Sequence, residues 1–205
     1  MAYGIEVKNQ DGIIILDNSP YSVLAVIESG TYASGTNIPM QVDPNAMLFI
    51  RPTITSASIY GGVDNKGWGS NNSVNATSGT ISYVKMRPMS SFPVSGYGLA
   101  IYDNTGSPLL VFTDSAQYVR LMSSTTTAVT STITIPMRAT LSGKYKYINR
   151  ECLGIINQWT SGYDTVNVSF SAAGDAVYLD RHFFSQYNYA PRDRNITKQY
   201  NVIEC

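Results

Sequence analysis

Residues 3–17 read YGIEVKNQDGIIILD, the pattern of two short β-strands around a turn. Tyr3, Ile5 and Val7 alternate with polar or small residues, which is the period-two spacing of a strand with one buried face. NQDG then supplies the turn, because Gly12 tolerates the positive φ that tight hairpin turns require. IIIL follows as a return strand that is too apolar to have a face in water. We therefore predict a β-hairpin at the start of the chain.

A similar phrase, YGLAIYDNTGSPLLVFTD, occupies residues 97–114. Tyr97, Leu99 and Ile101 repeat the alternating face of the first stretch, and Gly106 repeats its turn. Chance is one interpretation, since alternating strands around an Asn-Gly-like turn are common. The interpretation that we prefer is a pair of related hairpins, placed either in two subdomains or in one sandwich.

The rest of the chain carries many short apolar stretches with period-two spacing, separated by Gly, Pro and Asn. Strands are predicted at 21–28, 46–51, 56–60, 80–86, 117–122, 127–135, 153–159, 165–171 and 176–180. The one place for a helix is around 144–158, and Gly143 and Gly154 predict that it is short. This pattern predicts an all-β protein, an antiparallel β-sandwich of jelly-roll-like type.

The domain organisation that follows from the repeated hairpin has three parts. Residues 1–92 form a β-subdomain with the first hairpin, and residues 93–182 form one with the second. Residues 183–205, rich in aromatic and charged side chains, form an extended C-terminal arm that packs along another surface, within the chain or on a neighbouring subunit. The alternative is one continuous sandwich over 1–182.

Composition excludes several classes of function. Charged residues are 14% of the chain, against roughly 25% in an average soluble protein, and the net charge is zero. No basic stripe is visible, so we expect no nucleic-acid partner. The apolar runs are short and the N-terminus has no secretory pattern, so we expect no membrane insertion and synthesis in the cytoplasm. Cys152 and Cys205 are expected to be reduced thiols.

The search for catalytic chemistry finds no convincing site. His182, beside two Phe residues, has no G-x-S-x-G nucleophile motif to work with, and a packed or interfacial role is the better interpretation. Asn9, Asp11 and Asp103 suit turns better than a calcium loop, because neither copy supplies the closing Glu. A pair of carboxylates for glycoside hydrolysis is not expected, because the chain has only 14 acidic residues and several of them lie in turns. We predict that the chain is not an enzyme, with no catalytic residues, no cofactor and no metal site.

A long polar loop, 61–79, holds the one candidate binding site. Long loops inside compact domains are usually functional or mobile. Trp68 with Tyr60 is a candidate platform for stacking a sugar, and Asn71 and Asn72 are candidate hydrogen-bond partners. The alternative interpretation is an aromatic residue tucked against the domain or a neighbouring subunit.

The two hairpins also resemble a recurrent phrase in the tail-tip, baseplate and tail-fibre-associated structural proteins of tailed bacteriophages. Those proteins typically begin Met-x-Tyr-Gly, followed by an alternating strand, an Asn/Asp-x-x-Gly turn and an apolar strand that closes in Asp. The first matching set is Tyr3, Gly4, Ile5, Val7, Asn9, Gly12 and Asp17. The second set is Tyr97, Gly98, Leu99, Ile101, Asp103, Gly106 and Asp114.

This resemblance implies a structural protein of the virion, located in the distal tail and made in the host cytoplasm. It implies partnership with other tail proteins, and a homo-oligomer, with a trimer as the first guess. A host surface glycan or receptor is a further expected partner. The alternative function is a receptor- or carbohydrate-binding module that uses the 61–79 loop, and a polysaccharide depolymerase is a third. The resemblance carries over no catalytic residues.

Overall fold

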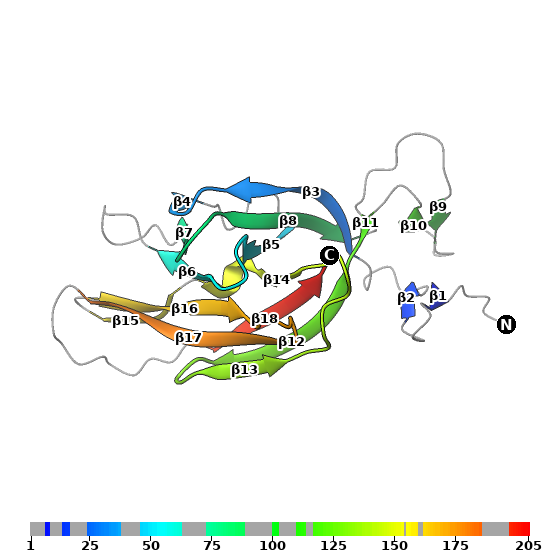
Figure 1. The fold of residues 1–205 in the computed structure, drawn as a ribbon. Helices are drawn as coiled ribbons and strands as arrows, with labels where there is room; N and C mark the ends of the chain where they lie inside the picture. Colours follow the sequence, from blue (N-terminus) through cyan, green and yellow to red (C-terminus); the bar gives the residue numbers. More distant parts are fainter. Residues whose placement is uncertain are drawn as a thin grey trace.

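A computed structural model of the chain describes residues 7–8, 14–16, 24–37, 46–62, 73–88, 100–102, 110–113, 117–153, 155–159, 162–185 and 197–205. These residues form two large antiparallel β-sheets that pack face to face, with two small hairpins beyond one end (Figure 1). The prediction of an all-β sandwich is confirmed. The helical element in the described residues is a 3-10 turn, η2 (Arg150–Leu153), inside the predicted helical window and as short as expected.

The first sheet has seven strands, and every pairing in it is antiparallel. Its order is β11 (Gln117–Tyr118), β3 (Leu24–Tyr32), β8 (Ile81–Pro88), β5 (Met47–Pro52), β14 (Lys146–Asn149), β18 (Thr197–Glu204) and β12 (Arg120–Ala128).

The second sheet is also seven-stranded and antiparallel. Its order is β13 (Ile133–Pro136), β17 (Ala176–Ser185), β16 (Gly162–Phe170), β6 (Ser58–Gly62), β7 (Ser73–Ala76) and β4 (Thr36–Asn37), with β15 (Ile155–Trp159) also paired to β16.

Strand pairing differs from the division into subdomains at residue 92. The first sheet places β5 beside β14, and the second places β6 beside β16, so each sheet joins strands from both halves of the chain. The core between the sheets is likewise shared. The pairing therefore corresponds to the alternative, a single sandwich, rather than to the 1–92 and 93–182 subdomains.

The C-terminal segment also differs from the predicted arm over 183–205. Residues 183–185 complete β17, and β18 lies inside the first sheet, paired with β12 on one side and β14 on the other. Tyr200, Val202 and Ile203 of β18 are fully buried. The arm was a wrong prediction for residues 197–204, because their alternating apolar side chains complete the domain's own core.

The interior between the sheets is apolar and continuous. Ile50, Ile148 and Val202 of the first sheet meet Val166 and Leu179 of the second in one buried cluster. Strands of both sheets present alternate side chains to it, as period-two geometry requires.

A second buried cluster lies on the other face of the first sheet. Phe49, Val84, Met86, Tyr147 and Ile203 belong to it, and all five are at least nine-tenths buried. Along their strands, these residues alternate with residues of the buried cluster between the two sheets. The first sheet is therefore apolar on both faces, which explains why MLFI in β5 has no polar alternation.

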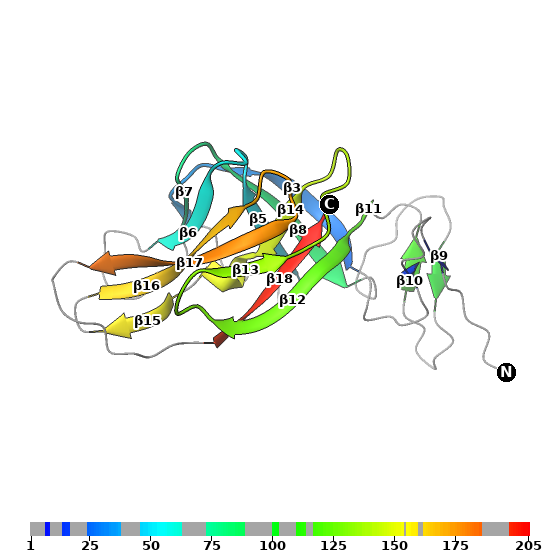
Figure 2. The same ribbon diagram turned by 60° about the horizontal axis from the view of Figure 1, so that its bottom comes forward.

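Both predicted hairpins are confirmed as antiparallel strand pairs. β1 (Val7–Lys8) pairs with β2 (Ile14–Leu16), and β9 (Ala100–Tyr102) pairs with β10 (Leu110–Thr113). Each hairpin is a separate two-stranded sheet that joins neither large sheet. In both views the two hairpins lie next to one another, beyond the end of the sandwich (Figures 1 and 2). The inward face predicted for the first hairpin falls mostly on residues outside the described ones.

Candidate functional site

The residues predicted to bind a sugar are only partly described. Tyr60 lies half-buried on β6, opposite Asn75 of β7 and Asn167 of β16 in the strand register. Trp68, Asn71 and Asn72 fall in the connection between β6 and β7 and lie outside the described residues. The sugar-stacking platform therefore stays a prediction.

Residues considered for catalysis or metal binding do not gather in the described part of the chain. His182 lies on β17, opposite Thr165 of β16. Within the described residues, no group of three or more His, Cys, Asp or Glu side chains is placed to hold a metal ion.

Among the helical segments that the structure describes, none has the length and apolar character needed to cross a membrane.

A pocket of about 320 Å³ opens at the end of the sandwich where β5 and β16 finish and β14 begins. Its walls come from the end of β5 and the loop after it, from the loop before β14, and from the turn after β16. The lining residues are Arg51, Pro52, Thr55, Thr140, Leu141, Lys144, Tyr145, Lys146, Phe170, Ser171, Ala172, Ala173 and Gly174. No Asp or Glu belongs to this set.

Arg51 is a charged residue of the pocket that aromatic rings hold in position. Its guanidinium lies over the ring of Tyr145, 3.9 Å from the centroid, and 5.5 Å from the ring centroid of Tyr147. Nη1 donates a hydrogen bond to the carbonyl oxygen of Pro52 at 3.1 Å. Nε is buried and has no hydrogen-bond acceptor. Cation–π contacts and one hydrogen bond thus hold the group in place without neutralising it.

Lys146 has the opposite situation, because it is buried and used within the fold. Its ammonium donates to the carbonyl oxygens of Arg138 and Gly174, and to Thr140 Oγ1 at 3.1 Å. Thr140 Oγ1 also donates to the Gly174 carbonyl at 3.2 Å. Lys146 therefore ties the two loops of the pocket together, as a structural cation.

The outer rim of the pocket is apolar and exposed. Leu141 is 48% exposed and Tyr145 is 52% exposed, which is unusual for side chains of this size. Their backbone is fixed nonetheless. Leu141 N–H donates to Glu204 Oε1 at 3.0 Å, and Tyr145 exchanges two 3.0 Å backbone hydrogen bonds with Cys205. The rim is an ordered apolar surface next to Arg51.

Sequence reasoning missed this pocket, because its residues come from three distant segments. The one local indication was the alternation of Lys144, Tyr145, Lys146 and Tyr147. That alternation places two lysines on one face of the chain and two tyrosines on the other. Nothing in it indicated that Arg51 would meet the tyrosine face.

A buried ion pair lies at a different place in the sandwich. Asp164 of β16 is fully buried; its Oδ2 accepts a hydrogen bond from Nε of Arg181 on β17 and forms an ion pair with Nη2 of the same guanidinium. A buried pair of this kind is costly to break, because removing one partner leaves an uncompensated charge. Its role is to join neighbouring strands, and neither residue lines the pocket.

Around η2, burial shifts two pKa values in opposite senses. Desolvation raises the pKa of the fully buried Cys152 thiol well above its usual range, and lowers that of Lys198 to about 8. The Lys198 ammonium donates to the carbonyl oxygen of Glu151 at 3.4 Å. Cys152 is thus a protonated core residue, and neither it nor Cys205 forms a disulfide in this structure.

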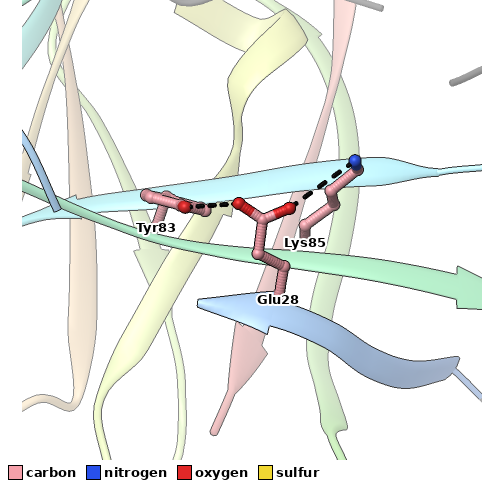
Figure 3. Close-up of polar contacts among 3 residues, drawn as sticks. All are labelled: Glu28, Tyr83 and Lys85. Atoms are coloured by element: carbon pink, nitrogen blue, oxygen red, sulfur yellow. Dashed lines mark hydrogen bonds and ion pairs between the residues drawn. The ribbon is translucent and has the colours of Figure 1, made fainter. Parts of the chain in front are cut away.

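A polar trio joins β3 to β8 (Figure 3). The Tyr83 hydroxyl donates to Glu28 Oε1 at 2.6 Å, and Lys85 Nζ lies 3.7 Å from Glu28 Oε2. The hydrogen bond to Glu28, followed by desolvation, raises the pKa of Tyr83 to about 12. The Tyr83 ring also stacks on Tyr32, with centroids 4.4 Å apart. These contacts satisfy one another across the strands, so the trio stabilises the sheet and is not a reactive site.

Comparison with protein-family models, with curated proteins and with solved structures found no match for this chain.

Proposed function

We propose that the chain is a structural component of a bacteriophage virion, in the distal tail at the tip, the baseplate or the fibre attachment. It acts by oligomeric assembly and by contacts with the host surface. The observation that carries this proposal is the pair of hairpins beyond one end of a complete sandwich. Their sequences are also the part of the chain that resembles phage tail proteins.

The hairpins are incomplete as folded units. An isolated two-stranded sheet is marginally stable in water, and stability usually needs a third strand or a packed layer. β1–β2 and β9–β10 each pair only within themselves in the described structure. Their strands are apolar, with Ile14, Ile15 and Leu16 in β2 and Leu110, Val111 and Phe112 in β10. Strands of such apolar residues are suited to an interface with other subunits.

The sandwich itself fits a passive role. Within the described residues, its buried charges are used in structural contacts, as for Lys146 and Asp164. Such a domain provides a rigid support, and the hairpins provide the means of assembly. We expect a closed ring of identical subunits, with a trimer as the first model to test.

The oligomeric state tests the assembly part of the proposal. Light scattering after size-exclusion chromatography should give a multiple of the chain mass of 22.4 kDa, three times that mass for a trimer. The double variant Ile15→Lys, Val111→Lys should be monomeric while its circular dichroism and melting temperature stay close to those of the wild type. Leu121→Lys, the same chemical change at a position 59% exposed on the sandwich, is the matched control and should remain oligomeric.

Location in the particle tests the virion part separately. Particles purified from the lysate of the strain that encodes the chain should contain it, detected by mass spectrometry, and gold-labelled antibodies should mark the tail end. A chain that stays in the soluble fraction and is absent from particles would refute the virion role. A wild type that stays monomeric at high concentration would refute only the assembly part of the proposal.

A further inference from the structure

The pocket at the end of the sandwich is lined by cations, and the two carboxylates just outside its lining, Glu204 and Asp175, accept hydrogen bonds from Leu141 N–H and Ser171 Oγ. The ion pairs Glu28–Lys85 and Asp164–Arg181 lie elsewhere in the sandwich and involve neither Arg51 nor Lys144. Both of these cations line the pocket, and no carboxylate lines it. Lys146, the third cation, is already surrounded by two carbonyl oxygens and a hydroxyl. An incoming anion would therefore meet two available charges.

Arg51 is prepared to bind an anionic group. Its guanidinium is held against Tyr145 and Tyr147, so little conformational freedom remains to be lost on binding. A planar guanidinium matches carboxylate and phosphate oxygens with two parallel hydrogen bonds, and this geometry is stronger than a contact with a point charge. Its Nε is buried without an acceptor, so an incoming anion would contact the Nη atoms of the guanidinium.

The rest of the pocket suits a small ring that carries hydroxyl groups. Leu141 and Tyr145 offer exposed apolar surface beside Arg51, and the exposed Thr55 adds a hydroxyl. A volume of about 320 Å³ is at the lower end of small-molecule sites, which span roughly 300–1,000 Å³. A sugar ring has an apolar C–H face for an aromatic residue and polar edges for hydroxyls. A carboxylate or phosphate on that ring would complete the match.

The geometry points to a binding site for an anionic saccharide, whose carboxylate or phosphate pairs with Arg51 and Lys144 while the ring packs on Tyr145. This site is distinct from the 61–79 loop and shares no residue with it. It does not depend on the assembly role of the hairpins. Uronic acids and phosphorylated sugars share the chemistry that the pocket recognises, so the experiment compares them directly.

The test is a titration of the full chain, followed by ¹H–¹⁵N NMR, with trigalacturonate, glucose 6-phosphate, inorganic phosphate and the neutral maltotriose. One or both anionic sugars should bind and shift the amide signals of Arg51, Lys144 and Tyr145. Maltotriose and inorganic phosphate should bind at least tenfold more weakly. The favoured anionic sugar identifies the acid group. Affinity should also fall as salt rises, because exposed charges are screened.

Three substitutions test the residues. Arg51→Met keeps the apolar stem over the tyrosines and should weaken binding about 10- to 100-fold, the range for charge-assisted hydrogen bonds. Lys144→Gln should weaken it several-fold. Lys85→Gln removes the same charge from the Glu28 pair, outside the pocket, and should leave affinity within about twofold. Melting temperature and NMR spectra show whether each variant is folded. If Arg51→Met is misfolded, the effect of Lys144→Gln on affinity decides the test, because Lys144 is exposed and its substitution does not disturb the core.

The inference is overturned if neither anionic sugar binds, or if maltotriose binds as tightly as both. Equal affinity for inorganic phosphate and the anionic sugars would overturn the saccharide assignment. Binding that Arg51→Met and Lys144→Gln leave unchanged would place the ligand elsewhere. The outcome is independent of oligomeric state, so failure of the assembly proposal would be seen separately by light scattering.

Discussion

Gly61 is a residue where the packing of the sandwich leaves no room for a side chain. It lies on β6, and a Cβ atom there would collide with the backbone carbonyl oxygen of Leu153 in η2. Its own carbonyl oxygen accepts a 3.0 Å hydrogen bond from Thr165 Oγ1 of β16. Strand and turn are therefore in backbone contact at this point, so neither can move aside for a methyl group without losing a hydrogen bond.

We expect Gly61→Ala to lower the free energy of unfolding by about 3 kcal/mol, at the upper end for overpacking. Gly143→Ala is the matched control, since Gly143 has φ +73° and open space around its Cβ position. There only the strain of the left-handed conformation remains, about 1 kcal/mol. Urea unfolding monitored by circular dichroism measures both. Equal costs for the two substitutions would contradict the contact with Leu153.

Sequence reasoning did not identify the role of Gly61. The residue was placed at the start of the long polar loop predicted over 61–79. In the structure Gly61 continues β6, and the described part of the loop region begins with strand again at Ser73. A glycine required for close approach and a glycine required for a turn have the same appearance in a single sequence.

At the scale of elements, most strands were predictable from alternation, and the errors have local causes. The segment predicted as one strand over 127–135 is the end of β12, a bend and the start of β13. Its Thr and Ser residues favour strands, yet they also form turns readily, and alternation continued through the bend. β4, β7 and β14 are two to four residues long, too short for a period to be recognised.

The position of β18 could not be read from the local pattern. Residues 197–205 alternate like any strand, and nothing in them shows that the partners are β12 and β14. Long-range pairing depends on which apolar faces meet in space. This segment, which follows an aromatic and charged stretch, was therefore interpreted as an arm, although it is an internal strand of the first sheet, between β14 and β12.

We expect Val202→Asp to prevent folding or to cost at least about 4 kcal/mol, because it buries a charge in the core between the sheets. Thr197→Asp, at the exposed start of the same strand, should change stability by less than about 0.5 kcal/mol. Urea unfolding and NMR dispersion measure both. If Val202→Asp were as stable as the wild type, β18 would not be part of the sandwich.

At the scale of the whole molecule, the sequence predicted the layers but not the pocket. Two facing sheets follow from many short alternating strands, because each strand needs a partner for its apolar face. The pocket depends on Arg51, Thr140 and Gly174 being brought together by three connections. Each of those residues is ordinary in its own segment, so their shared location comes only from the fold.

Cooperativity of the sandwich can be measured through its two thiols. Cys152 lies in η2 within the core between the sheets and is fully buried, whereas Cys205 is half-buried at the end of β18. Because burial raises the pKa of Cys152, almost no thiolate is present near pH 8, and the sulfur also has no access to reagent. Labelling of Cys152 therefore requires the sheets to separate.

With a thiol-reactive disulfide reagent, we expect one fast thiol per chain, removed by Cys205→Ser, and one slow thiol, removed by Cys152→Ser. The slow rate should rise with urea along the same slope that describes global unfolding, because η2 contacts both sheets and opens only when they part. A shallower slope would mean that η2 opens locally. In that case Cys152 would become reactive through a local opening of η2 while the two sheets stay packed.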